Sequence, residues 1–136
     1  MMTTIVAEPM GSTKTMKILY WIFTAWLALG MLSTGIVQFI GVEEEVASFK
    51  HLGYPTYLMT LLAVWKVLGV VAILLPRLPL LKEWAYAGFF FVSSGAAISH
   101  AVLGDGISEI FPSILLLLLT AASWYLRPSA RRIITL

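Results

Sequence analysis

Four long apolar segments run along this chain, and each has about the length that a helix needs to cross a bilayer. A spanning helix takes about 20 consecutive apolar residues, because the hydrocarbon core is about 30 Å thick. The segments cover residues 18–40, 56–75, 83–103 and 110–126. The pattern therefore predicts an all-α membrane protein built as a four-transmembrane-helix bundle.

Prolines mark several ends of these segments. Pro55 and Pro112 suit the first turn of a helix, where the missing N–H costs no hydrogen bond. Pro76 and Pro128 indicate where the second and fourth helices stop. The second span is therefore bracketed by prolines on both sides.

The loop after the first span has a helical pattern of its own. Val42, Val46 and Phe49 recur at helical spacing, with Glu43–Glu45 and Lys50 opposite them. This predicts a short amphipathic helix in the first outer loop. We expect it to lie on the outer membrane surface; the alternative is a lid over the bundle.

The two ends of the chain differ in composition from the part between them. Residues 1–16 are small and polar, which predicts a disordered N-terminal tail. Residues 17–128 then make up the transmembrane domain, and residues 129–136 form a basic C-terminal tail. The first apolar segment is too long for a signal-peptide core, so we expect it to be retained as a span.

Basic residues are distributed unevenly between the two sides of the predicted membrane domain. One side carries Lys14, Lys17, Arg77, Lys82, Arg127, Arg131 and Arg132. Lys50 alone falls on the other side. Because the side richer in lysine and arginine stays in the cytoplasm, both termini are predicted to be cytoplasmic. We expect the protein in a bacterial cytoplasmic membrane.

Composition supports the membrane assignment and narrows the chemistry. The chain is 60% hydrophobic and 12% charged, whereas soluble domains carry about 25% charged residues. It has no cysteine, which excludes disulfides, cysteine-ligated zinc and iron–sulfur clusters. With two histidines we expect no metal site and no haem, since His51 lies in a predicted loop. The net charge of +2 gives no reason to expect a nucleic-acid partner.

Lys66 lies near the middle of the second span, where a lysine costs on the order of 3 kcal/mol. Ala63 and Gly69 share its helix face. If that face points inward, Lys66, Gln38 and His100 would line one cavity that opens to the outside. The chain offers no acidic residue at the depth of Lys66. The alternative is a lysine that extends into a crevice between helices without binding anything.

The third span is the most polar of the four. Tyr86, Ser93 and His100 recur at intervals of seven and share one helix face. We expect Ser93 to hydrogen-bond to its own helix backbone. For His100 two alternatives stay open: it titrates or holds a ligand, or it is bonded to Asp105 or a carbonyl. The candidate ligand-binding residues are Lys66, His100, Gln38, Ser93, Tyr86 and Asp105.

Several segments resemble the DoxX-like family of small membrane proteins: FKHLGYP at 49–55, KVLG at 66–69, LKEWAYAGFF at 81–90, GAAISH at 95–100 and GDG at 104–106. The resemblance covers about Lys17 to Arg127. It implies a four-span helical bundle. The family takes its name from a membrane subunit linked to quinone reduction during thiosulfate oxidation, which makes a quinone the candidate cofactor. The resemblance carries no catalytic residue over to this chain.

Three classes of function remain open. The first is an accessory or ligand-binding protein that holds a small lipophilic molecule, with a quinone as one candidate. The second is a membrane scaffold or assembly factor without a ligand. The third is a cofactor-free membrane enzyme that acts on an apolar substrate through His100 and Asp105. The expected partners are the lipid bilayer, a lipophilic ligand, a membrane or redox subunit, and further copies of the chain.

Overall fold

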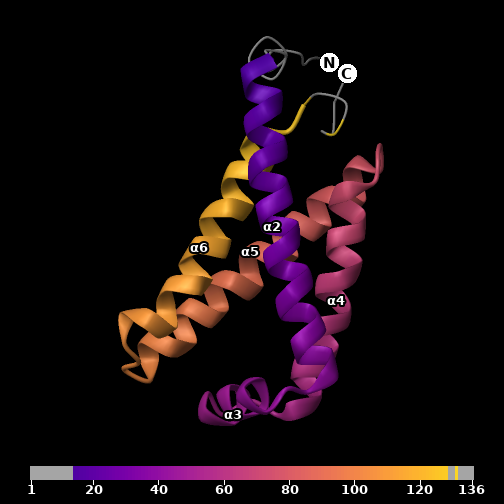
Figure 1. Cartoon of the computed structure of the whole chain (residues 1–136). Coiled ribbons are helices and arrows are strands. Elements are labelled where there is room, and N and C mark those ends of the chain that lie inside the picture. Colours follow the sequence, from indigo (N-terminus) through magenta and orange to yellow (C-terminus); the bar gives the residue numbers. More distant parts are fainter. Residues whose placement is uncertain (1–13, 129–130, 132–136) are drawn as a thin grey trace.

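The computed structural model describes residues 14–128 and residue 131, and in this part of the chain it contains five α-helices and no strand. The helices are α2 (Lys14–Ile40), α3 (Glu43–His51), α4 (Thr56–Leu74), α5 (Pro79–Val102) and α6 (Ile107–Tyr125). Four of them, α2, α4, α5 and α6, are long and apolar enough to span a membrane (Figure 1). The predicted all-α fold with four spans and a short helix in the first loop is confirmed.

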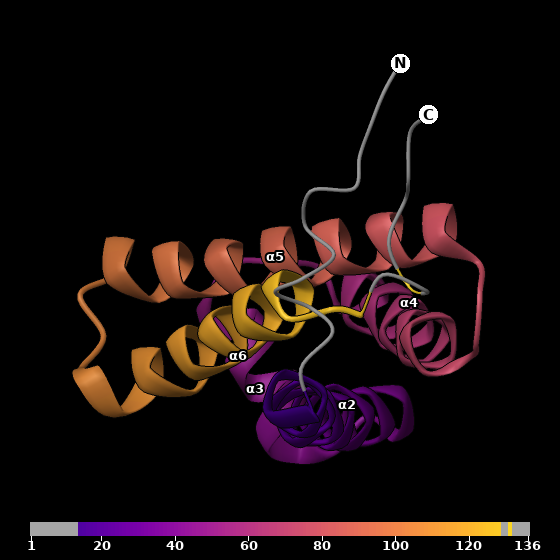
Figure 2. The same cartoon turned by 90° about the horizontal axis from the view of Figure 1, so that it is seen from above.

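The four long helices pack around a ring, in the order α2, α4, α5, α6. Successive long helices run in opposite directions, so that α2 begins and α6 ends at the same end of the bundle, with α3 at the opposite end (Figure 1). We refer to these as the terminal end and the α3 end. Viewed from above, α5 and α2 lie on opposite sides with α4 and α6 between them (Figure 2).

The α4 and α5 helices meet near the terminal end and diverge toward the α3 end (Figures 1 and 2). Gly69 allows the close approach, because a Cβ at this position would lie 2.7 Å from the ring of Phe89. Within lipid, such close packing of small residues holds helices together in place of a hydrophobic drive. The core that includes Leu27, Val70 and Leu119 surrounds this contact.

Basic side chains satisfy the last carbonyl groups of α4. Lys82 is fully buried, and its Nζ donates to the carbonyl of Ala72 at 2.7 Å and to that of Leu75. Arg131 donates to the carbonyl of Ile73 at 2.9 Å. Because the final carbonyls of a helix have no partner within the helix, these cations complete its hydrogen bonding and oppose its dipole.

Three helices start earlier than the sequence pattern predicted, the first being α2, which begins at Lys14 instead of residue 18. The α5 helix begins at Pro79 instead of residue 83, with the proline at its start and Lys82 turned into the bundle rather than left in a loop. The α6 helix begins at Ile107 instead of residue 110. Pro112 therefore lies inside α6 and not in its first turn, and it forfeits only the hydrogen bond to the carbonyl of Ser108. The α4, α5 and α6 helices each end one residue before the predicted position.

The N-terminal tail ends earlier than the sequence analysis predicted. Lys14–Met16 were expected to be disordered, but they form the first turn of α2. Residues 1–13, which make up most of the predicted disordered tail, lie outside the described residues. So does most of the predicted basic tail, of which Arg131 is described.

The α3 helix packs against the rest of the bundle. It lies across the α3 end of the bundle and packs against α4 and α2 (Figure 1). Phe49 is only 9% exposed, and its ring lies 6.3 Å from that of Tyr54. These contacts support the alternative of a lid over the bundle, and the position of α3 relative to the membrane surface stays a prediction. The apolar face of α3 is used within the protein because the diverging helices leave space beneath it.

The contact between Gly69 and Phe89 leads to a stability prediction. We expect Gly69→Val to lower the free energy of unfolding by about 1–3 kcal/mol, the usual cost of overpacking a close contact. Denaturant unfolding in detergent micelles measures this change. Gly88→Val is the matched control, because a Cβ at Gly88 would have no neighbour within 4 Å. Equal unfolding midpoints for the two variants would show that the contact is not tightly packed.

Candidate functional site

A cavity of about 460 Å³ lies at the α3 end of the bundle. All five helices contribute to its lining, and small-molecule sites in proteins usually have a volume of about 300–1,000 Å³. Its apolar wall includes Met31, Leu62, Val92 and Leu116. Its polar lining includes Thr34, Gln38, Glu45, Lys66, Ser93 and His100.

Lys66 is buried in the wall of this cavity, with 7% of its surface exposed. Its Nζ donates to Gln38 Oε1 at 2.9 Å and to Thr34 Oγ1 at 3.3 Å, both on α2. Gln38 Nε2 in turn donates to Glu45 Oε1 on α3 at 3.1 Å. The lysine is thus linked to an acidic side chain through an amide. Within the described part of the chain, no carboxylate lies within 4.0 Å of its ammonium.

Sequence reasoning missed Thr34 and placed Glu45, with Glu43 and Glu44, opposite the apolar face of the short helix. Glu43 and Glu44 are exposed, but Glu45 is half-buried and lines the cavity. Glu45 lies four residues before Phe49, and residues at this spacing share a helix face. That spacing was the available signal, because Phe49 was already expected on the apolar face.

Ser93 does not behave as predicted. Its hydroxyl is buried and has no hydrogen-bond partner among the described residues, whereas we expected it to bond to its own helix. The neighbouring serines Ser94 and Ser99 do make such bonds, to the carbonyls of Phe90 at 2.7 Å and Gly95 at 2.8 Å. A buried polar group left without a partner costs about 1–3 kcal/mol. Ser93 therefore places in the cavity wall a hydroxyl group that has no hydrogen-bond partner among the described residues.

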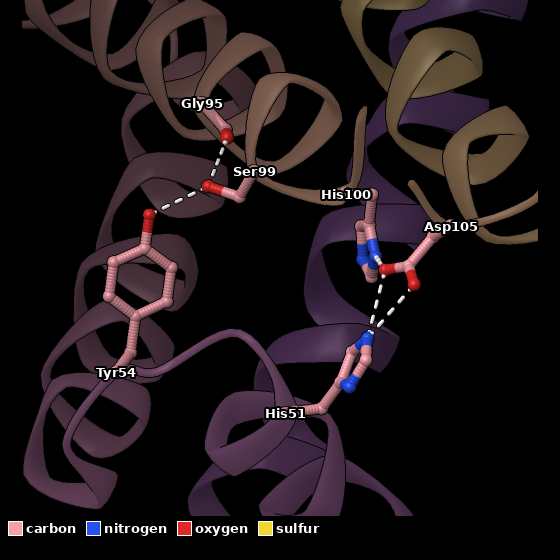
Figure 3. A network of polar contacts seen from close by, with 6 residues as sticks. All are labelled: His51, Tyr54, Gly95, Ser99, His100 and Asp105. Carbon is pink, nitrogen blue, oxygen red and sulfur yellow. Dashed lines mark hydrogen bonds and ion pairs between the residues drawn. The ribbon is translucent and has the colours of Figure 1, made fainter. Parts of the chain in front are cut away.

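Asp105 joins two histidines from different elements (Figure 3). Its carboxylate lies 2.7 Å from His100 Nδ1, at the end of α5, and 2.9 Å from His51 Nε2. The sequence analysis had placed His51 in a loop, but His51 is the last residue of α3. The hydrogen bonds from His100 and then His51 lower the pKa of the Asp105 carboxyl from its ordinary value. The cluster ties α3 to the turn between α5 and α6.

A second contact in the same region joins the start of α4 to α5. Tyr54, which comes just before α4, has its hydroxyl 2.6 Å from the Ser99 hydroxyl (Figure 3). The loop after α3 is therefore held to α5 where α4 and α5 have already diverged. Together with the Asp105 cluster, this contact fastens the C-terminal end of α3 to α5 and to the turn that follows α5.

Tyr86 lies apart from the other candidate residues. Its hydroxyl is 2.7 Å from Ser123 Oγ, which lies 2.6 Å from Thr24 Oγ1. This chain of hydroxyls links α5, α6 and α2 nearer the terminal end. Tyr86 and Ser93 do share a helix face, but seven residues separate them by roughly 10 Å along the axis.

The structure thus brings together four of the six candidate residues. Lys66, Gln38, Ser93 and His100 all line the cavity. Asp105 does not line it, but it holds His100 in place. Across residues 14–128 and 131, no group of three or more histidine, aspartate or glutamate side chains is arranged to hold a metal ion. The polar groups of the cavity are suited to hydrogen bonding with a small organic molecule.

The long apolar helices and the cavity between them define a four-span integral membrane protein. The model of the DoxX-like family matches residues 22–123, about three quarters of the chain. The chain therefore belongs to the DoxX-like family, as its motifs had suggested. No curated protein and no solved structure shows significant similarity to it.

The Asp105 cluster makes the stability of the protein depend on pH. A carboxyl whose pKa is lowered by folding stabilises the folded state when it is ionised, and this contribution disappears as the pH falls through the lowered pKa. We therefore expect wild type to melt at a higher temperature than Asp105→Asn at neutral pH. The difference should shrink toward zero as the pH is lowered below the ordinary range of aspartate.

Thermal melts of both proteins over a series of pH values measure this difference. Glu44→Gln serves as the control, because Glu44 is exposed on α3. A difference between wild type and Asp105→Asn that stays constant down to the most acidic pH would contradict the role given to the carboxylate.

Proposed function

We propose that this integral membrane protein binds a small lipophilic molecule in the cavity at the α3 end. The observation that supports this most directly is the buried lysine in the cavity wall. An ammonium group has three hydrogen-bond donors, and Lys66 uses two of them on Thr34 and Gln38. A ligand oxygen in the cavity would accept the third.

The chemistry of the walls indicates which kind of molecule would fit. Most of the cavity wall is apolar, and its polar groups include the Lys66 Nζ, which has a donor left over, and the buried Ser93 hydroxyl, which has no partner among the described residues. A planar or compact apolar molecule with one or two carbonyl or hydroxyl oxygens would satisfy both. A quinone has this chemistry, and family membership makes it the first molecule to try. A redox role would need a partner subunit, because the chain has no cysteine for a thiol relay or an iron–sulfur cluster.

We also propose that the terminal end faces the cytoplasm of a bacterial cell. Lys14, Lys17 and Arg77 lie near this end, whereas the α3 end carries Glu43 and Glu44. This arrangement follows the rule that basic loops stay in the cytoplasm. The cavity would then lie in the outer half of the membrane.

One observation favours a second function, proton transfer to or from the bound molecule. His100 lines the cavity while its Nδ1 lies 2.7 Å from Asp105. A carboxylate that orients a histidine in this way is a common arrangement for a general base. If a turnover assay is found, His100→Ala should abolish the pH dependence of its rate. A rate profile unchanged by this substitution would eliminate the proton-transfer function.

Binding of a quinone headgroup tests the ligand proposal. We expect saturable binding of a methyl-substituted benzoquinone without a side chain to the protein in lipid nanodiscs. Lys66→Met should weaken it roughly tenfold or more, because a hydrogen bond from a charged donor contributes about 1.5–3 kcal/mol. Native mass spectrometry of the extracted protein provides an independent search for a co-purified molecule.

Lys50→Met is the matched control for this experiment, since Lys50 is exposed on α3 and does not line the cavity. Binding that is equally strong in Lys66→Met would remove the proposed role of the lysine. If no saturable binding is seen and Lys66→Leu keeps full stability and partner recovery, the scaffold function would replace the ligand-binding one.

The orientation has its own test, which the absence of cysteine makes simple. A membrane-impermeant maleimide should label Ala47→Cys, on the exposed face of α3, in intact cells. Lys17→Cys, at the terminal end, should react only after the cells are permeabilised. The reverse pattern of labelling would invert the proposed topology.

A further inference from the structure

A second hollow adjoins the cavity on the outside of the bundle. It is a groove of about 450 Å³ between α4 and α5, with an apolar lining that includes Leu68, Ala72, Trp84 and Gly88. Leu62, Lys66 and Val92 line both the groove and the cavity. The buried lysine therefore stands where the two spaces meet.

The groove runs along the outside of the contact between α4 and α5, and Gly69 and Phe89 belong to its lining. Gly69 and Phe89 hold the two helices together, and the helices separate toward the α3 end (Figures 1 and 2). Gly88 adds to the space, because a Cβ at this position would meet nothing within 4 Å. Trp65 and Trp84, which line the groove, are 57% and 64% exposed on the surface of the spanning helices. The groove thus faces the lipid.

From these observations we propose that the cavity and the groove form a single site for an amphiphile with one long apolar chain. The oxygen-bearing head of the amphiphile lies in the cavity at Lys66 and Ser93. Its chain passes between Leu62 and Val92 and lies in the groove between α4 and α5. The molecule enters sideways from the bilayer. This inference rests on the proposed function, and it specifies the ligand class and its route of entry.

The composition and length of the groove favour a hydrocarbon chain as its occupant. Lys66 is the one charged residue in its lining, and it lies at the junction with the cavity. The other lining residues are aliphatic or aromatic, and the indole N–H groups of Trp65 and Trp84 are their side-chain hydrogen-bond donors. The lining on α5 extends from Leu81 to Val92, roughly 16 Å along the helix at about 1.5 Å per residue. A groove of this length can hold an extended hydrocarbon chain of several CH₂ groups.

Two probes with the same headgroup separate the two parts of the site. One is the benzoquinone without a side chain, and the other carries a decyl chain. In nanodiscs, Gly88→Trp fills the groove and should weaken binding of the decyl probe by about tenfold or more, because the chain must then lie elsewhere. Binding of the probe without a chain should not change. Gly95→Trp, at a cavity glycine that also has open space around it, should weaken both probes.

Ala87→Trp is the matched control. Ala87 precedes Gly88 on α5, is exposed, and lines a separate hollow on the side facing α6. This variant should bind both probes as wild type does. Thermal melting of each variant verifies that it is folded, and Gly88→Leu provides a smaller filling of the groove if the tryptophan variant does not fold.

The outcomes distinguish this inference from the proposal on which it rests. If Gly88→Trp binds the decyl probe as wild type does, or weakens both probes equally, the groove is not the site of the chain. In that case, Lys66-dependent binding of the probe without a chain would leave the proposed function standing. Loss of that Lys66 dependence would overturn the proposed function itself. A dimer in native mass spectrometry that Gly88→Trp dissociates would assign the groove to a second copy and also overturn the inference.

Discussion

The burial of a lysine side chain within a spanning helix is the constraint on which the α3 half of this protein depends. In the bilayer such a group must find partners inside the protein. Lys66 finds Thr34 and Gln38 on α2, and Gln38 extends the connection to Glu45 on α3. One side chain thereby ties three helices together. The same requirement places a cluster of polar groups in the wall of the cavity.

The two halves of the bundle are built in different ways. At the terminal end, α4 and α5 are in close contact through Gly69, and hydroxyl groups link α2, α5 and α6 through Ser123. Lys82 and Arg131 complete the hydrogen bonding of the last turn of α4. At the α3 end the helices diverge, and α3 covers the space between them. The close-packed terminal end thus holds in place the helices that line the cavity at the α3 end. Binding sites in proteins are generally supported by rigid elements of this kind.

Much of the fold could be derived from local patterns, whereas the site could be derived only in part. The length of each apolar segment identifies the spans, and the intervals between Tyr86, Ser93 and His100 place them on one helix face. Those intervals carry no information about depth, so they did not separate Tyr86 from the cavity. Local patterns also failed for Ser93, whose hydroxyl was expected to bond to its own helix. The amphipathic pattern of α3 was correct, but it is the same for a helix on a membrane and for a lid.

The sequence by itself determined that this chain is a four-span membrane protein of the DoxX-like family with a lysine buried in its second span. The length of a hydrophobic segment and the order of motifs are local properties of the chain. They can be read without knowing which residues pack against one another. Only the tertiary structure decided that Lys66 faces a cavity, that Glu45 is linked to it, and that Asp105 holds His51 and His100 together. The physical reason is that these contacts depend on how far α4 and α5 diverge, and that divergence results from the packing of all four spans.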